Sequence, residues 1–307
     1  MKKSMTFRIF LLFFNLAYLC VMIYPKSTEF PLIQSMSYFP YSDNTLLKKK
    51  DFLLNLNLYY SNIYMFNREK TVVNDFENLS TVFEFRYGLA KGLNIGIYLR
   101  HSYIFGGMMD RFIEKFHGFF GFSDNHRPDY LRDSVHYKFN DSFFYTDKKW
   151  GFSPVIVSFL GQIFESPYFS IKTRVAIGLP LSNAPGLSSD KPFLTPGLIL
   201  TYKRDWFSID FSNYLSFFKE PVWLKGEDVR SYIYRSEIRL HIKRFITGFI
   251  FRTSPFENGD ISHKAKQIYF GFKVFKNLEF IILEDFSPFD TTPDISFNVR
   301  VKLFNKK

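Results

Sequence analysis

The sequence predicts an all-β fold, an antiparallel transmembrane β-barrel of about 12 strands. Segments of alternating apolar and polar residues recur along the chain, and the connections between them alternate between short and long. Aromatic residues make up 21% of the 307 residues, with 41 Phe and 19 Tyr. The interfacial girdles of a membrane barrel require such an excess of aromatic side chains.

The N-terminal residues 1–27 are expected to be a secretory signal peptide or, if uncleaved, an anchor. Lys2, Lys3 and Arg8 precede an apolar run over residues 9–24, which is the order of a signal sequence. The single cysteine, Cys20, lies inside this run, so the mature chain would have no disulfide and no thiolate site. Residues 28–49 follow as an N-terminal lead-in, and residues 50–304 are expected to form the barrel as one domain.

Period-two alternation begins near Leu54 and continues to Leu303. Clear examples are residues 54–58, 79–87, 93–100, 169–179, 207–212, 234–243, 267–274 and 295–303. Each segment has one apolar and one polar face, and a length of about 9–11 residues suits a tilted membrane strand. The apolar faces are therefore expected to meet lipid and the polar faces to line the lumen.

The connections predict the topology and the location. Short turns are expected at residues 88–92, 165–167, 203–205, 243–244 and 276–277. Long loops are expected at 67–77, 105–151, 181–191, 219–230, 254–264 and 286–293. This layout is typical of barrels of the bacterial outer membrane, with the short turns and both termini periplasmic. Outer-membrane lipids and the barrel-insertion machinery are the partners expected for such a chain.

The stretch GGMMDRFIEKFHGFFGF, residues 106–122, departs from the alternation. Its apolar residues have helical spacing, which predicts one amphipathic helix in the long loop after strand 3. Three roles remain open: the helix caps the mouth of the barrel, lies in the outer leaflet, or plugs the lumen. Asp110 near the helix start would favour the helix dipole, and His117 would hydrogen-bond a loop.

The predicted polar faces carry a surplus of basic residues, and the formal net charge is +11. A positive lumen would favour anionic solutes, whereas a wall of ion pairs would conduct nothing. The candidate lumen residues are Arg86, Arg100, Lys172, Arg174, Arg235, Arg239, Lys273 and Arg300.

Three blocks of sequence resemble a family of outer-membrane β-barrels known only as a domain of unknown function. They are FPLIQSMSYFPYSDN at residues 30–44, FRYGLAKGLNIGIYLRHSYIFGGMMDRFIEKFHGFFGFSDNHRP at 85–128, and LEDFSPFDTTPDISFNVRVKLF at 283–304. The resemblance implies the fold and the location but no activity. It adds two groups of motif residues. The helix motif comprises Gly106, Gly107, Asp110, Phe112, Ile113, Phe116, His117, Gly121 and Arg127. The C-terminal motif comprises Glu284, Asp285, Pro293 and Asp294.

Enzymatic chemistry has little support in the sequence. His101 and Ser102 are adjacent on a strand and point to opposite faces, so they cannot pair directly. A loop site built on His117, Asp124 and His126 would lack further ligands for a metal. No cofactor, no metal and no nucleic-acid partner is expected. The predicted function is a passive channel or transporter for small anionic solutes, with a non-conducting surface barrel or an outer-membrane hydrolase as alternatives.

Overall fold

The computed structural model describes residues 31–38, 44–66, 72–107, 109–111, 115, 133–181, 184–256, 265–275, 277–285 and 296–306. Two short helical elements are α2 (Pro31–Gln34) and η2 (Val222–Leu224). The strands are β1 (Phe52–Phe66), β2 (Val72–Ala90), β3 (Leu93–Phe105), β4 (His136–Phe139), β5 (Phe143–Tyr145), β6 (Lys149–Phe152), β7 (Val155–Glu165), β8 (Phe169–Leu179), β9 (Phe193–Lys203), β10 (Phe207–Phe218), β11 (Tyr232–Ile242), β12 (Phe245–Arg252), β13 (Ala265–Phe275), β14 (Leu278–Asp285) and β15 (Ser296–Lys306). No helix within these ranges has the length and apolar character needed to cross a membrane.

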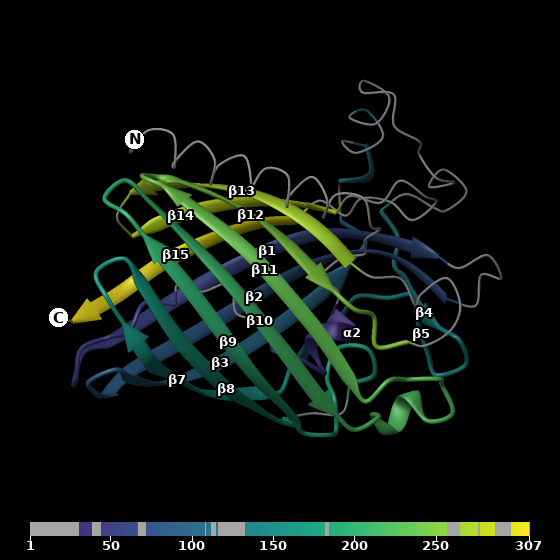
Figure 1. Cartoon of the computed structure of the whole chain (residues 1–307). Coiled ribbons are helices and arrows are strands. Elements are labelled where there is room, and N and C mark those ends of the chain that lie inside the picture. The colour runs from purple at the N-terminus through teal and green to yellow at the C-terminus, as the bar shows by residue number, and fades with distance from the viewer. Residues whose placement is uncertain are drawn as a thin grey trace.

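Twelve strands close into one antiparallel barrel (Figure 1), which confirms the predicted fold class. Each of β7 to β15 pairs with its neighbour in sequence. The circle closes where β15 pairs with β1, and where β3 pairs with both β2 and β7. Closure matters because an open sheet edge would leave backbone donors and acceptors without partners in lipid.

The two ends of the barrel differ as predicted. At one end, here called the turn end, the described turns contain residues 91–92, 166–168, 204–206, 243–244 and 277. The opposite end, here called the loop end, carries the long connections. β1 begins and β15 ends at the turn end, where the C-terminus lies in Figure 1.

Two predictions about the loop end are wrong in detail. Residues 72–77 were expected in a loop, but they belong to β2 because they pair with β1 and, at residues 72–75, with β4. The excursion after β3 contains further strands that the sequence did not indicate. The β4–β5 hairpin extends the sheet beyond β2, and β6 continues the line of β7 along β3.

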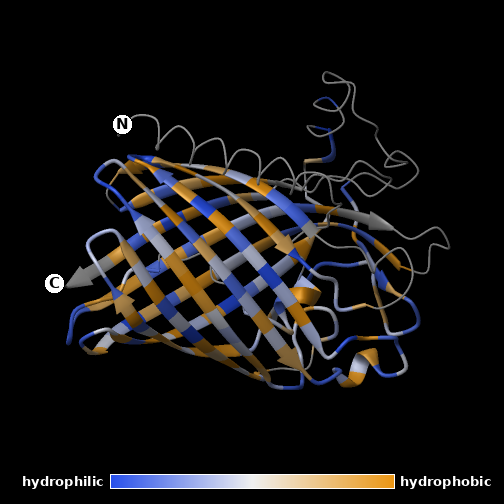
Figure 2. Cartoon of the chain, in the orientation of Figure 1, coloured by the Kyte–Doolittle hydropathy of each residue, from blue (hydrophilic) through white to orange (hydrophobic). Residues whose placement is uncertain are grey.

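The outer face is apolar along the strands, as expected for a face that meets lipid. Orange and blue positions alternate along the ribbons in Figure 2. Exposed side chains of this face include Phe83, Phe85, Ile97, Val175, Ile177, Leu194, Leu198, Phe270 and Ile282. The inner face is less uniformly polar than predicted, because Ile199, Tyr214, Ile246 and Ile250 also point inward and are buried.

The N-terminal residues 31–38 and 44–47, here called the plug segment, lie inside the barrel. Every residue of α2 is buried, and α2 appears in purple within the barrel in Figure 1. Leu32, Ile33 and Met36 belong to one hydrophobic cluster with inward residues of the strands, such as Ile63 and Ile104. The loop half of the lumen is therefore filled by the plug segment, which the sequence had indicated only as a lead-in.

The long connections pack over this cluster at the loop end. Tyr137 of β4 donates a hydrogen bond to the Gly186 carbonyl at 2.7 Å, and Trp223 Nε1 donates to the Ser188 carbonyl at 3.1 Å. Asp190 accepts from the Val222 backbone N–H at 2.9 Å. Burial alone would raise the pKa of Asp190, but hydrogen bonds from Lys191 and Val222 outweigh it and hold the pKa below its usual value. These contacts join three loops into one cover.

A glycine on the inner face makes room for an aromatic ring. Gly197 of β9 faces Tyr214 of β10, and a Cβ on Gly197 would lie 2.3 Å from Tyr214 Cδ1. We therefore expect Gly197→Ala to lower the free energy of unfolding by about 1–3 kcal/mol through overpacking. Urea titration of the refolded barrel measures this change.

The matched control is Gly161→Ala, because a Cβ on Gly161 would meet its nearest neighbour, Thr173 Cγ2, at an ordinary 3.7 Å. This variant should stay within about 0.5 kcal/mol of the parent chain. Equal destabilisation by the two variants would contradict the proposed packing of Tyr214 on Gly197.

Candidate functional site

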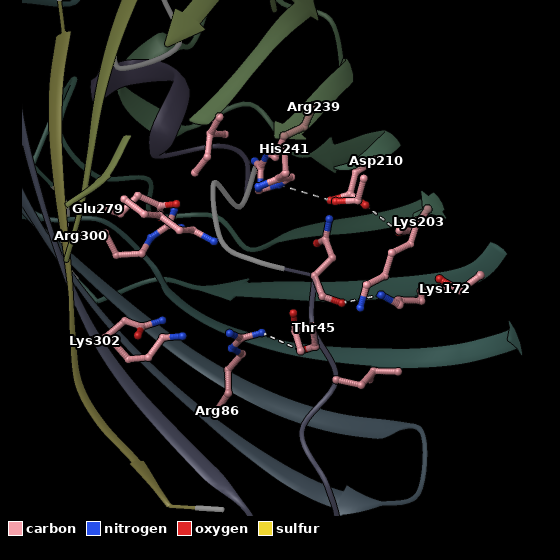
Figure 3. A pocket seen from close by; sticks show the side chains of 18 of the residues that line it. Thr45, Arg86, Lys172, Lys203, Asp210, Arg239, His241, Glu279, Arg300 and Lys302 are labelled. Carbon is pink, nitrogen blue, oxygen red and sulfur yellow. Dashed lines mark hydrogen bonds and ion pairs between the residues drawn. The ribbon is translucent and has the colours of Figure 1, made fainter. Parts of the chain in front are cut away.

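A cavity of about 790 Å³ occupies the turn half of the barrel. Residues 166–168 and Asn277 of the turns border it, so it reaches the turn end, and residues 44–46 of the plug segment form its inner boundary. Figure 3 shows charged side chains entering it from opposite walls. Its basic lining residues are Arg86, Lys172, Lys203, Arg239, Lys273, Arg300 and Lys302, together with His241, and its acidic ones are Glu165, Asp210 and Glu279.

The strand register places all eight candidate lumen residues on the inner face. Five of them, Arg86, Lys172, Arg239, Lys273 and Arg300, line the cavity. The other three lie elsewhere on the inner face: Arg100 lies over the Tyr59 ring at 5.0 Å, and Arg174 and Arg235 are buried.

Three more residues also line the cavity: Lys203 and Lys302, which the alternation had likewise placed on polar strand faces, and His241, which it had not singled out. Their signal was present in the alternation, because each lies two residues from another inward residue of its own strand. The register of the strands, rather than a motif, brings them to the same cavity.

The arginines of β11 are held by one carboxylate. Glu237 is almost fully buried and bonds Arg239 Nη2 at 2.7 Å and Arg235 Nη2 at 3.0 Å. Tyr269 of β13 donates to the same carboxylate at 2.7 Å and accepts from Arg239 Nε at 2.9 Å. The Glu237 carboxylate therefore balances the charges of these arginines, and the hydrogen bonds form a network that joins β11 to β13.

Arg300 and Arg86 are paired in the same way. Arg300 Nη1 lies 2.6 Å from Glu279 Oε2, and its Nε donates to Asn57 Oδ1 at 2.8 Å. Arg86 Nε lies 3.0 Å from Glu84 Oε1, and Asn55 donates to the other oxygen of Glu84 at 2.9 Å. Each arginine therefore contributes shape and hydrogen bonding to the wall, with its charge largely balanced.

The lysines differ from the arginines. Within the described residues, the ammonium groups of Lys203, Lys273 and Lys302 form no hydrogen bond and no ion pair. The nearby carboxylate of Asp210 is held instead by Thr201 Oγ1 at 2.7 Å, with His241 Nε2 at 3.9 Å. Unpaired ammonium groups inside a low-dielectric wall give the cavity a positive potential.

Basic wall residues also hold the plug segment. Lys172 Nζ donates to the Asn44 carbonyl at 2.8 Å, and Arg86 Nη1 donates to the Thr45 carbonyl at 3.1 Å. At the turn end the chain leaves the lumen beside β2, where Lys50 N–H donates to the Gly88 carbonyl at 2.8 Å. On this side the cavity is thus bounded by a segment whose neutral backbone carbonyls accept hydrogen bonds from charged wall residues.

The described part of the helix motif lies outside the lumen. Asn62 and Glu77 lie on the strand face of Leu58 and Leu79, which is the outer face. Glu77 accepts hydrogen bonds from Tyr60 and from the backbone N–H of Met109. Gly107, at φ 67°, lies directly over the Glu77 carboxylate, where a Cβ would collide with it.

Asp110 completes this contact on the outer face. One oxygen accepts from the Asp133 backbone N–H at 2.9 Å, and the other lies 3.5 Å from Asn62 Nδ2. Gly106 packs against the Asp133 carbonyl. The segment is therefore fastened to the wall of β1 and β2 at the loop end.

The remaining motif residues are only partly covered. The backbone is helical at residues 110, 111 and 115. Glu284 and Asp285 end β14 and pair with Ile268 and Gln267 of β13. The motif residues outside the described residues are Phe112, Ile113, Phe116, His117, Gly121, Arg127, Pro293 and Asp294.

The sequence-level candidates for enzymatic chemistry do not come together in the described part of the chain. Ser102 points inward and hydrogen-bonds Ser80 at 2.9 Å, whereas His101 lies on the outer side between the rings of Trp150 and Phe152. His117, Asp124 and His126 lie outside the described residues. The described residues contain no group of three or more His, Cys, Asp or Glu side chains arranged to hold a metal ion.

The division between paired arginines and free lysines can be tested on stability. Glu237→Gln should lower the free energy of unfolding by about 3–5 kcal/mol, because it leaves two buried arginines without their anion. Lys203→Gln should change it by less than about 0.5 kcal/mol, because the lysine has no partner to lose. Urea unfolding of both variants measures the two values, and a larger loss for Lys203→Gln would contradict the assignment.

Comparison with known proteins gives a family match over part of the chain and a similar fold. Residues 23–150 match the family described as "Protein of unknown function (DUF3187)". The match includes the first two resembling blocks, residues 30–44 and 85–128, and thereby confirms the resemblance over that part of the chain. No curated protein matches the sequence.

Solved outer-membrane barrels share the architecture. The crystal structure of the COG4313 outer membrane channel from Pseudomonas putida F1 is similar with a TM-score of 0.55 at 9% identity, over 87% of this chain and 100% of that chain. The KdgM porin gives 0.43 at 10% identity, over 81% and 99%. The Pseudomonas putida toluene transporter TodX gives 0.40 at 8% identity, over 91% and 98%. At 9% identity the likeness to the first of these structures is one of fold alone, that of an outer-membrane β-barrel.

Proposed function

We propose that this chain is a channel of the bacterial outer membrane that passes small anionic solutes, with the turn end in the periplasm. One observation carries the proposal: the cavity of about 790 Å³ in the turn half is lined by basic groups that outnumber the acidic ones. Among these basic groups, three lysines have no partner in the described part of the barrel. A solute with a negative charge would find free donors there.

The location is supported by the outer face. Large apolar side chains remain exposed on strands all around the barrel, and exposing them to water would be costly. A lipid belt removes that cost, and a closed barrel is the only strand arrangement that satisfies its backbone there. The similar structure from Pseudomonas putida F1 is itself described as an outer membrane channel.

Anion preference follows from the arrangement of the charges. Carboxylates neutralise Arg86, Arg239 and Arg300 at short distance, so these groups contribute little to the field at the cavity centre. Lys203 and Lys273 are exposed to the cavity and lack such a neighbour. Rings of Lys and Arg are the usual lining of anion-selective pores.

Selectivity should therefore depend on the free lysines. Reversing three charges with Lys203→Glu, Lys273→Glu and Lys302→Glu should change the barrel from anion-selective to cation-selective, because the unbalanced lumen charges change sign. The reversal potential of the refolded protein in a planar bilayer under a salt gradient measures this.

The control is a chain with the same change of net charge at the loop end. Lys148→Glu, Lys219→Glu and Lys225→Glu alter three exposed residues that do not line the cavity. This control should keep the selectivity of the parent chain. A cation-selective parent, or an equal shift in the control, would rule out the cavity lysines as the filter.

A non-conducting barrel is the second candidate, and a specific observation favours it. The plug segment and the loop-end cover fill the loop half of the lumen with apolar side chains, including Leu32, Met36 and Leu224 at 0% exposure. Conduction thus depends on whether the plug segment leaves this position. Steady current or silence from the parent chain separates the two candidates.

Removing the plug segment should raise conductance. Deleting residues 28–47 takes out the segment that fills the loop half, and we expect a several-fold larger single-channel current. Deleting residues 112–130 instead removes part of the excursion while keeping its fastening through Gly107 and Asp110, and should leave the current unchanged.

Planar-bilayer recording of both deletion variants tests this, after a gel heat-shift confirms that each forms a folded barrel. A larger current from the second deletion alone would place the obstruction in the excursion. Silence from the first deletion variant would favour the non-conducting barrel.

A further inference from the structure

Arg174 of β8 differs from the buried arginines Arg235, Arg239 and Arg300. Its side chain is 1% exposed. Nη1 donates to Tyr38 Oη at 3.2 Å and Nη2 donates to Asn44 Oδ1 at 3.3 Å, while Nε has no partner within the described residues. No carboxylate of the described chain lies within ion-pair distance. Glu84 acts on it only at longer range and is itself bonded to Arg86 and Asn55.

A buried guanidinium held only by neutral acceptors is a poor arrangement. Removing such a charge from water costs several kcal/mol by general estimates, and only a good counter-ion recovers most of it. Arg235, Arg239 and Arg300 each have that counter-ion, at 2.6–3.0 Å. Arg174 has a phenol and an amide instead. A planar carboxylate would bond it better, because it matches the guanidinium with two charge-assisted hydrogen bonds.

Both neutral acceptors belong to the plug segment. Lys172 lies two residues earlier on the same inner face of β8, and it donates to the backbone carbonyl of Asn44. Asn44 and Lys172 both line the cavity, whereas Arg174 does not. The Asn44 side chain therefore lies between the cavity and Arg174. An anion that enters from the turn end meets Lys172 first and then the amide oxygen that it could replace.

We propose that Arg174 and Lys172 form a binding site for a small carboxylate solute, and that binding there displaces Asn44 and releases the plug segment. The proposal deepens the proposed function, because it rests on the same cavity as the route of entry. The solute shifts the plug only if it binds the released state more tightly. That difference exists here because the guanidinium gains a counter-ion only after Asn44 has left. Solute binding and plug release are then reciprocally coupled.

Thiol labelling measures plug release without any need for current. Met36 has 0% exposure in the hydrophobic cluster, so a cysteine in its place should react with a water-soluble maleimide only when the plug segment leaves the lumen. The full chain carries Cys20→Ser and Met36→Cys, which leaves one thiol. Succinate is the probe, and sodium chloride at the same ionic strength is the comparison.

We expect succinate to raise the labelling rate by about fivefold or more, the lower end of typical coupling between two sites. Chloride should leave the rate unchanged, because a single spherical ion does not reproduce the bidentate contact. Arg174→Gln should abolish the response to succinate, since the neutral side chain no longer requires a counter-ion.

Two further variants make the test specific. Asn44→Asp supplies the missing carboxylate from the plug segment itself, so it should slow labelling and suppress the response to succinate. Lys219→Gln removes one positive charge at the loop end, outside the cavity and away from the plug segment, and should keep the response. Asn44→Asp also keeps the test decisive if Arg174→Gln fails to fold.

Equal rates in succinate and chloride would overturn the proposal, and so would a full response in Arg174→Gln or Asn44→Asp. Failure of the proposed function is a separate result. A barrel that never conducts can still show succinate-dependent labelling, and an anion-selective barrel without that labelling would keep its function and lose this site.

Discussion

Closing the hydrogen-bond ladder around twelve strands creates a lumen wider than a single layer of inward side chains can fill, and the remaining structure follows from that space. In the loop half the space is taken by apolar groups from three sources: inward strand residues, the loop-end cover and the plug segment. In the turn half it stays open as the charged cavity. The need to close the sheet in lipid therefore leaves a lumen of which the loop half is filled and the turn half is open.

The same strands carry different kinds of inward side chains in the two halves of the lumen. Where the wall meets the plug segment, Tyr38 and its neighbours pack against inward rings such as Tyr98, with ring centroids 4.8 Å apart. Nearer the turn end, inward positions carry charges, and buried arginines are tolerated there because Glu84, Glu237 and Glu279 balance them. Arg174 lies at the boundary between the two regimes. Its partners come from the plug segment instead of the wall, and this makes it the position at which we propose that a charge influences the plug.

Much of the fold could be predicted because period-two alternation is local. The alternation within each strand shows which of its residues lie on each face. The lengths of the connections, short turns or long loops, then give the number of strands and the two ends of the barrel. The same alternation put all eight candidate basic residues on the inner face. Pairing could not be predicted from it, since whether Arg300 meets Glu279 or whether Lys273 stays free depends on the register between strands.

The plug segment was missed for a physical reason. The stretch PLIQSMSY over residues 31–38 has neither strand nor long-helix periodicity, and its apolar residues are explained only by a cavity formed by strands far along the chain. The inner-face residues Ile246 and Ile250 gave no signal in the sequence, because β12 is apolar on both faces. The glycine pair at 106–107 is visible in the sequence as a break in the alternation. The reason for Gly107 is not visible there, because the Glu77 carboxylate that leaves no room for a side chain belongs to another strand.

The family match over residues 23–150 includes the residues of the plug segment and leaves out most of the basic residues that line the cavity. It contains the plug segment, the strands β1 to β3 that carry it, the Gly88 contact at the turn end and the Glu77–Asp110 fastening at the loop end. Lys172, Arg174, Lys203, Lys273 and Lys302 all lie beyond it. The matched region thus holds a plugged hairpin wall, and the charges that would select a solute come from the rest of the barrel.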